Sequence, residues 1–408
     1  MLYLIDGDDT RNRAEKFGLS MAIGMGVIGW IGFWFGVTGS LNKPILFSLL
    51  LGLSTGIFLL FRDRPVELDP NPENRISGEI SENPALIWIL CAIASVAFLF
   101  DLAEGGTTPL DADTLAYHFQ IPKEFSELER VEFIPTAFSG AIPLLLHMTY
   151  TIAYALGEEP ALTGWTLTSG WFASILFFLL LKRWLTLPWA LATALIFQTL
   201  PAMTFGAGSG QVEARLAAFA IIAVIGFIDI ADGKNTRPVI LSGIGAGFFM
   251  AAKLSGVFFV AALAVGVVIR TKNFWLAAMF LAIACIVGGQ WYVWNFIHTG
   301  DPFFPFLFKY AQFLNIANLD YWNSDHLSTL ASSIETRRQG VGINHLWFTY
   351  PIEATFWPLP SIQSGRVGLG PYYFFLLPVA LYGVWVGRSR IIQSKFCILV
   401  FSILIFYG

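Results

Sequence analysis

Long apolar runs alternate with short polar segments along most of the chain. Residues 85–102 and 274–289, for example, carry no charge until their ends. Such runs approach or reach the roughly 18–20 residues that a helix needs to cross the apolar core of a membrane. The pattern predicts about eleven membrane-spanning helices. We expect these spans at residues 18–40, 44–62, 85–102, 162–181, 188–205, 212–231, 238–252, 254–269, 273–291, 371–387 and 393–407.

The composition supports the same interpretation. Hydrophobic residues make up 56% of the 408-residue chain and charged residues 13%, whereas ordinary soluble domains are about 25% charged. A soluble chain of this length would need more polar surface to cover its core. We therefore predict an all-α, polytopic bundle with juxtamembrane helices at its outer face. The net charge of −4 provides no basic surface for nucleic acid.

Cysteine and histidine spacing indicates no metal site. Cys91, Cys285 and Cys397 lie inside apolar runs, and no spacing among them suits a disulfide framework or a zinc site. His326 and His345 also lack ligand spacing with a neighbouring His, Cys or Asp. The sequence thus indicates no cofactor; a divalent metal would be compatible with the chemistry considered below but is not indicated.

Basic residues orient the predicted spans, because Lys and Arg collect on the cytoplasmic side of short loops. Arg11, Arg13 and Lys16 place the N-terminus inside, before a first run that is too long for a cleavable signal peptide. Residues 137–157 form a further apolar stretch. If this stretch crossed the membrane, residues 182 and 183, a Lys-Arg pair, would fall outside.

Residues 137–157 are therefore predicted to be re-entrant or to lie on the surface. Pro143 and His147 favour this interpretation, because broken or polar segments at membrane depth are usually buried in protein. Every later basic cluster then falls inside. Residues 103–136 become the first outer loop, and residues 292–370 become one long outer segment.

Four regions follow from this topology. Residues 1–84 hold two N-terminal spans and a cytoplasmic linker, and residues 85–291 form the transmembrane core that includes the first outer loop. Residues 292–370 are the long extracytoplasmic segment. Residues 371–408 hold the C-terminal spans, and we expect the sequence to be a fragment because it stops within the last one.

The first outer loop carries a pair of carboxylates, Asp111 and Asp113. Two carboxylates one residue apart at a membrane face could supply a general base and a partner that tunes its pKa. The alternative is structural, since Asp113 before residues 114–120 resembles a helix N-cap. The capping role does not exclude a function, because an N-cap carboxylate is held in a fixed position.

Other charged residues gather on the same predicted face. Lys253 lies at the outer turn of a helical hairpin, where it either extends to a lipid headgroup or holds the phosphate of a lipid-linked substrate. Glu213 opens the span at 212–231, as a salt-bridged span end or as a substrate contact. Arg337 and Arg338 could clamp a diphosphate or a sugar carboxylate, unless they form a solvated doublet.

Several stretches resemble the bacterial GT-C glycosyltransferases, a group of polytopic enzymes related to protein O-mannosyltransferases and the lipid A aminoarabinose transferase. The resemblance covers roughly residues 90–375. It rests on Asp-Ala-Asp-Thr-Leu-Ala-Tyr-His at 111–118 with Pro-Lys-Glu-Phe at 122–125, Gly-Phe-Phe-Met-Ala-Ala-Lys-Leu-Ser-Gly at 247–256, Trp-Tyr-Val-Trp-Asn-Phe-Ile-His-Thr-Gly-Asp-Pro-Phe-Phe-Pro at 291–305, and Gly-Leu-Gly-Pro at 368–371.

The resemblance implies that Asp113, four residues before Tyr117, is the base that activates the acceptor, with Asp111 as its partner. The chain departs from the family pattern at three positions. Thr114 replaces an acidic neighbour, Gln211 occupies a usually acidic position two residues before Glu213, and Asp301 replaces an Asn. The two N-terminal spans are an addition. These departures bear on the substrate more than on the class of reaction.

We therefore expect a glycosyltransferase of the bacterial cytoplasmic membrane with an outward-facing site. It would move a sugar, with inversion, from a polyprenyl-phosphate donor to a hydroxyl of a glycan, lipid or protein. Predicted substrate-binding residues are Tyr117, His118, Lys253, Glu213, His298, Arg337 and Arg338. Two alternatives are a transporter or flippase for a lipid-linked or anionic solute, and an O-antigen ligase or polymerase with its key residues at 292–370.

Overall fold

The computed structural model describes residues 11, 13–61, 83–109, 111–134, 142–230 and 236–320, with isolated positions beyond them. These residues form helices joined by turns, and no strand occurs among them. The predicted all-helical fold is confirmed for this part of the chain. The spans expected at 371–387 and 393–407 lie outside the described residues, as does nearly all of the outer segment after residue 320.

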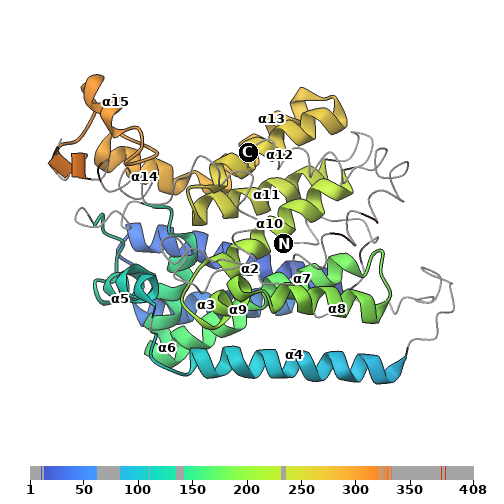
Figure 1. Ribbon diagram of the computed structural model, residues 1–408. Coiled ribbons are helices and arrows are strands. Elements are labelled where there is room, and N and C mark those ends of the chain that lie inside the picture. Colours follow the sequence, from blue (N-terminus) through green and yellow to red (C-terminus); the bar gives the residue numbers. More distant parts are fainter. Residues whose placement is uncertain are drawn as a thin grey trace.

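Figure 1 shows the helices, whose bounds in chain order are as follows. They are α2 (Arg13–Val37), α3 (Lys43–Phe61), α4 (Pro84–Gly105), the short π-helix η2 (Thr114–His118), α5 (Gln120–Glu127), α6 (Leu145–Gly170), α7 (Phe172–Leu181), α8 (Leu187–Gln198), α9 (Pro201–Gly208), α10 (Glu213–Asp229), α11 (Arg237–Ala252), α12 (Gly256–Thr271), α13 (Phe274–Gly288), α14 (Gln290–Thr299) and α15 (Phe308–Phe313).

Helix starts and ends follow local sequence signals. The side chain of Asn83 accepts a hydrogen bond from the backbone nitrogen of Ala85 at 3.1 Å, and Pro84 begins α4. Asn273 caps α13 in the same way, through the backbone nitrogen of Trp275 at 2.9 Å. These side chains satisfy backbone donors that the first turn of a helix leaves free. α14 ends at Gly300, whose positive φ of 77° suits glycine.

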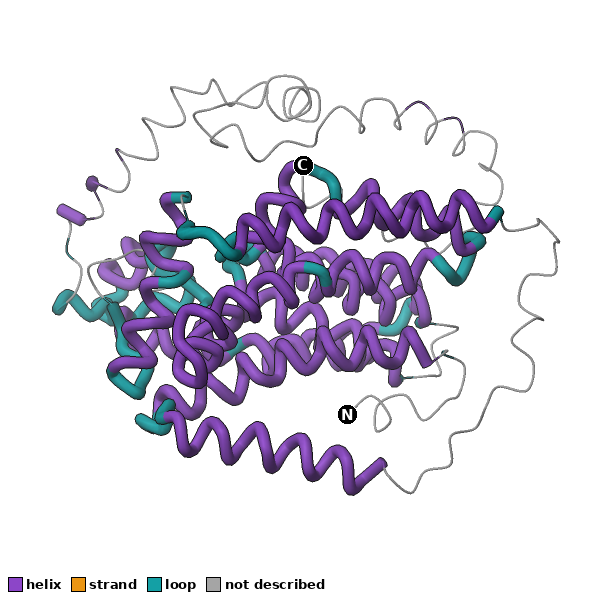
Figure 2. Tube along the Cα trace, turned by 90° about the horizontal axis from the view of Figure 1, so that it is seen from below, coloured by secondary structure: helices purple, strands orange, loops and turns teal. Residues whose placement is uncertain are grey.

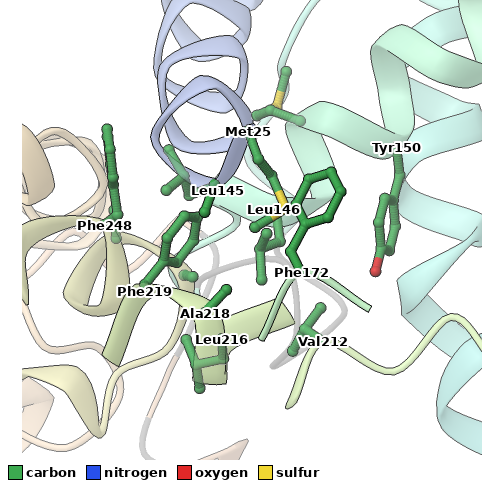
Figure 3. Close-up of a cluster of buried hydrophobic side chains, with 14 of the residues drawn as sticks. Met25, Leu145, Leu146, Tyr150, Phe172, Val212, Leu216, Ala218, Phe219 and Phe248 are labelled. Atoms are coloured by element: carbon green, nitrogen blue, oxygen red, sulfur yellow. The ribbon is translucent and has the colours of Figure 1, made fainter. Parts of the chain in front are cut away.

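The longer helices run roughly side by side, as Figure 2 shows. α11 packs between α10 and α13, and α2 packs against α6, α7 and α10. Figure 3 shows Met25, Leu145, Phe219 and Phe248 converging in the resulting apolar core. α4 lies along one edge of the bundle, and only Leu90 and Asp101 are buried in it.

α6 contains a sharp break. Gly157 and Glu158 have non-helical backbone angles, and Glu158 has a φ of 56°. The half of α6 before this break starts beside the middle of α2, where a side chain at Gly29 would collide with the carbonyl oxygen of Leu145. The other half leads into α7, and the Leu179 side chain of α7 lies against Gly18, near the start of α2.

The first half of α6 therefore enters the bundle only to mid-depth, and the chain crosses the bundle after the break. Whether residues 137–157 are re-entrant stays a prediction, because residues 137–141 lie outside the described part of the chain. α6 begins at Leu145, after the non-helical residues 142–144. Residues 135–141 lie outside the described residues. Leu145–Ile152 are all buried, which is the environment that a broken segment at membrane depth requires.

Ion pairs place the turn after α7 at the same end of the bundle as the N-terminus. Arg183 donates to both oxygens of Asp229, with its Nη1 lying 2.6 Å from Oδ1. Arg183 also pairs with Glu15, and Arg11 pairs with Asp229. Because α10 runs from Glu213 to Asp229, Glu213 lies at the opposite end. The structure thus separates the cluster around Arg183 from the predicted outer face.

Three described helical stretches are long and apolar enough to cross a membrane: Arg13–Val37, Pro84–Gly105 and Leu145–Leu181. Two bent pairs would raise the number to five. α11 and α12, 16 residues each, are shorter than the rule requires. The structure therefore shows an all-helical protein with several apolar helices able to cross a membrane, and the total of about eleven spans stays a prediction.

The predicted spans at 188–205 and 273–291 are not straight helices in the structure. α8 and α9 meet at 74°, and Pro201 begins the second helix, because proline cannot continue a helical hydrogen-bond ladder. α13 and α14 meet at 62° next to the glycine pair 288–289. The span predicted at 188–205 therefore combined most of α8 and α9, whereas the span predicted at 273–291 corresponds to α13, and most of α14 lies in the predicted outer segment.

Candidate functional site

The polar residues of the first outer loop meet two later turns of the chain at one end of the bundle. Gln211, just before α10, donates from Nε2 to Oδ1 of Asp111 at 2.9 Å. Lys253, between α11 and α12, forms an ion pair with Glu213 at the start of α10. Helices that alternate in direction bring these segments together although they lie up to about 140 residues apart.

The two carboxylates of the Asp-Ala-Asp pair have different roles. Oδ1 of Asp111 also accepts from the backbone nitrogen of Thr114 at 2.8 Å, which is an N-cap hydrogen bond. Asp113 directly precedes η2 but makes no side-chain capping bond, and it is exposed. The structural alternative considered for Asp113 is therefore wrong: Asp111 caps this turn, and Asp113 keeps a carboxylate without a hydrogen-bond partner among the described residues.

Tyr117 lies among three carboxylates. Burial raises the pKa of its phenol, and the negative charges of Asp113, Glu213 and Asp111 raise it further. The phenol is consequently protonated at neutral pH and can donate a hydrogen bond. Its ring also lies against His118, with 4.0 Å between the ring centroids. Tyr117 thus joins the carboxylates to the histidines beneath them.

His118 and His147 form a buried pair. Nδ1 of His118 and Nε2 of His147 share a hydrogen bond of 2.8 Å, and the two rings are nearly parallel, 13° apart. Burial lowers the pKa of His118 to about 3, so this imidazole is neutral near pH 7. The other two ring nitrogens, Nε2 of His118 and Nδ1 of His147, are buried and have no hydrogen-bond partner among the described residues.

The ion pair of Lys253 and Glu213 is half exposed, since the two side chains keep 44% and 46% of their accessible surface. An exposed pair of this kind contributes only about 0–1 kcal/mol. A ligand anion can therefore compete with Glu213 for the ammonium group at little cost. Lys253 is therefore a cation at this end of the bundle that could contact a phosphate.

Arg215 holds the glycine-rich segment before α10 in place. Its guanidinium is fully buried and donates to Ser169 Oγ at 3.0 Å, to the carbonyl of Gly206 at 2.8 Å, and to four further carbonyls. These carbonyls include the last ones of α9, which the helix itself leaves unpaired. The same contacts fix the backbone of Gln211, whose side chain holds Asp111.

His298 belongs to a different cluster. Its ring stacks on Phe133, with centroids 4.9 Å apart and planes 7° apart, and lies against Trp294. The nearby Asp301, buried and with a pKa raised by that burial, accepts from the backbone nitrogens of Phe303 and Leu307. The contacts therefore assign the Thr-Gly-Asp-Pro element a structural role, and they do not bring His298 to Asp113.

The predicted clamp of Arg337 and Arg338 lies outside the described residues. Among the residues that are described, no group of three or more His, Cys, Asp or Glu side chains is arranged to hold a metal ion. The candidate site within this part of the chain therefore consists of Asp111, Asp113, the Tyr117–His118 pair and the Lys253–Glu213 pair.

Sequence reasoning missed three residues that shape this site. From the sequence, Gln211 is only a departure from an acidic position, and His147 is only a sign of a broken segment. Arg215 is predicted to form a salt-bridged span end with Glu213, whereas the structure buries it among neutral oxygens. A polar residue inside an apolar run was the available signal, because burial of such a group requires partners. The identity of those partners depended on the fold.

Comparisons with known proteins leave the family of the chain open: no family model, curated protein or solved structure matches it. The fold and the site define a class, an all-helical protein with apolar helices able to cross a membrane and with a polar cluster at one end of its bundle. The resemblance to GT-C glycosyltransferases stays a prediction.

Proposed function

We propose that this protein is a membrane glycosyltransferase. It transfers a sugar from a polyprenyl-phosphate donor to an acceptor hydroxyl at the extracytoplasmic face of a bacterial cytoplasmic membrane, with inversion. The observation that carries the proposal is the exposed, unpartnered carboxylate of Asp113 on a turn fixed by Asp111, at the same end as a displaceable Lys253.

The reaction requires a base. An oxygen of Asp113 accepts the proton of the acceptor hydroxyl while the hydroxyl oxygen forms a bond to the anomeric carbon. A general base contributes typically about 10²–10⁴-fold to such a step. Asp113 suits this role because no described residue occupies its carboxylate, whereas Oδ1 of Asp111 is already taken by Thr114 and Gln211.

The leaving group requires a cation. The bond from the anomeric carbon to the phosphate oxygen breaks, and the electron pair leaves with the lipid phosphate. Lys253 stabilises this charge as the phosphate replaces Glu213 at the ammonium group. A polyprenyl chain suits the setting, since its tail can remain among the apolar helices while its phosphate reaches the polar end.

Membranes containing the protein, incubated with radiolabelled polyprenyl-phosphate sugars, test the proposal. The Asp113→Asn variant should lower transfer to glycan, lipid or protein by about 10²-fold or more, because it removes the base. Insertion and melting temperature should be unchanged, since this side chain makes no hydrogen bond among the described residues. Glu127→Gln, at another exposed carboxylate of the same loop, is the control and should transfer normally.

Full transfer by Asp113→Asn would contradict the proposal. Movement of the labelled lipid across the membrane without sugar transfer, and without dependence on Asp111 or Asp113, would instead support a transporter or flippase. Lys253 and Glu213 would then be recognition charges for the transported solute.

A further inference from the structure

A partly open cleft adjoins Asp111 on the side of α4, α6 and α9. Its cavity volume is about 80 Å³. Residues from the end of α4, the loop after it, the second half of α6 and the end of α9 form its walls. They include Glu104, Thr108, Asp111, Thr163, Phe205 and Ser209.

The hydroxyl groups of this cleft face it mainly as hydrogen-bond acceptors. Ser209 donates its proton to the carbonyl of Phe205 at 2.6 Å, and Thr163 donates to the carbonyl of Glu159 at 2.9 Å. Thr107 and Thr166 also donate to backbone carbonyls, at 2.8 Å and 3.0 Å. Each hydroxyl oxygen then retains lone pairs but no proton to offer. The walls therefore require a ligand that supplies donors.

The charges of the cleft disfavour anionic ligands. Its only ionisable lining residues are Glu104 and Asp111, and no Lys or Arg lines it within the described residues. A phosphate or carboxylate would face two like charges at close range, which is unfavourable in a partly desolvated site. The apolar faces of Phe119 and Phe205 suit a ring with C–H groups better than a small hydrated ion.

The residues that line the cleft include Asp111 but not Lys253 or Glu213. Asp113, the proposed base, follows Asp111 by two residues in the chain. A ligand in the cleft therefore meets the Asp111 carboxylate and not the cation proposed for the leaving phosphate.

We infer that this cleft binds the acceptor, and that the acceptor presents a hydroxyl-rich sugar unit that carries no phosphate or other anionic group. The hydroxyls of the sugar donate to the carboxylates and to the Ser and Thr oxygens of the walls. As an acceptor site the cleft rests on the proposed transfer reaction, but its preference for sugars without an anionic group can be measured without it.

Ligand-observed NMR on the purified full chain in detergent tests the cleft. The probes are the methyl glycosides of glucose, galactose, mannose and N-acetylglucosamine, together with glucose 6-phosphate and methyl glucosaminide as anionic and cationic analogues. At least one neutral glycoside should show saturation transfer at millimolar concentration, and glucose 6-phosphate should show several-fold less. Methyl glucosaminide should show no less than the neutral glucoside, because the charged residues that line the cleft are Glu104 and Asp111.

A matched pair of variants locates the binding. Thr163→Trp fills the cleft and should abolish the signal, whereas Thr168→Trp should keep it. Both threonines lie in α6 and donate to the carbonyl four residues earlier, but only Thr163 lines the cleft. Lys253→Gln should also retain neutral sugar binding. Equal melting temperatures of the two Trp variants exclude unfolding as the cause of a loss.

The inference is overturned if no neutral glycoside binds, if glucose 6-phosphate binds more tightly than the neutral glycosides, or if Thr163→Trp binds as the unaltered protein does. Failure of this inference can be distinguished from failure of the proposed function. Transfer that depends on Asp113 without neutral sugar binding would keep the glycosyltransferase and reject this acceptor. Binding that Thr163→Trp abolishes, without any transfer, would keep the sugar site and reject the enzyme.

Discussion

Arg215 and the His118–His147 pair show how single polar residues are accommodated in this apolar bundle. Arg215 donates to six neutral oxygens, and the two histidines bond to each other. Neutral partners avoid the cost of burying an additional charge. Both arrangements are buried next to the segments that carry Asp111 and Gln211. Arg215 holds the backbone of Gln211, whose side chain holds Asp111.

The buried imidazole of His118 should make stability depend on pH. Its pKa is lowered to about 3 in the folded protein, against about 6.5 in an unfolded chain. Between these values the unfolded state binds a proton that the folded state does not. Stability should therefore fall as the pH decreases below 6.5, by about 2 kcal/mol at pH 5.

Thermal unfolding of the detergent-solubilised protein at pH 7 and pH 5 measures this effect. His118→Gln, which can still hydrogen-bond His147, should show a smaller drop between the two pH values. His326→Gln, at an exposed histidine, should show the same drop as the unaltered protein. An unchanged drop in His118→Gln would assign the pH dependence to other groups.

At the scale of elements, glycines in α2 decide where the first half of α6 can lie. Gly29 allows the Leu145 carbonyl to approach the backbone of α2, and Gly32 lies against Met148 and Ile152. Within a membrane the hydrophobic effect does not drive helices together, because lipid tails are as apolar as the side chains. Helix association then depends on close packing, which small residues allow. The turn that carries His147 is thus positioned by α2, a helix of the N-terminal region.

Gly29→Ala should destabilise the protein by about 1–3 kcal/mol, because its methyl group would force α2 and α6 apart. Gly24→Ala is the matched control in the same helix, since a side chain there meets nothing within 4 Å. It should be neutral or stabilising by up to about 1 kcal/mol, as alanine favours helices. Thermal unfolding compares the two, and equal melting temperatures would show that this contact is loose.

At the scale of the whole molecule, the bundle has two chemically different ends. One end carries the ion pairs of Arg11, Glu15, Arg183 and Asp229. The other carries Asp111, Asp113, Glu213 and Lys253. Since basic residues favour the cytoplasmic side, we expect the cluster around Arg183 to face the cytoplasm and the candidate site to face outward.

Cysteine labelling in intact cells tests this orientation. In a background with Cys91, Cys285 and Cys397 replaced by serine, Trp184→Cys should react with a membrane-impermeant maleimide only after permeabilisation. Glu127→Cys, near the candidate site, should react in intact cells. Both positions are exposed in the structure. Labelling of position 184 from outside would reverse the orientation and remove the site from the extracytoplasmic face.

Local sequence features were sufficient for much of the fold. Apolar runs predicted the helices, and the basic residues predicted that Arg183 shares an end with the N-terminus, as its ion pairs with Glu15 and Asp229 show. The breaks between helices were harder to predict from the sequence. Pro201 and the glycine pair 288–289 were visible, but hydropathy averaged over a window passes through a bend without changing.

The sequence by itself determined that the chain is rich in apolar helices and that Asp111, Asp113, Glu213 and Lys253 belong to one end, because hydropathy and charge act locally and alternate with the direction of the helices. Only the tertiary structure decided which carboxylate is free. Asp111 is taken by Gln211, 100 residues away, and His118 by His147, 29 residues away. Such partners are chosen by the packing of helices, which no local pattern encodes.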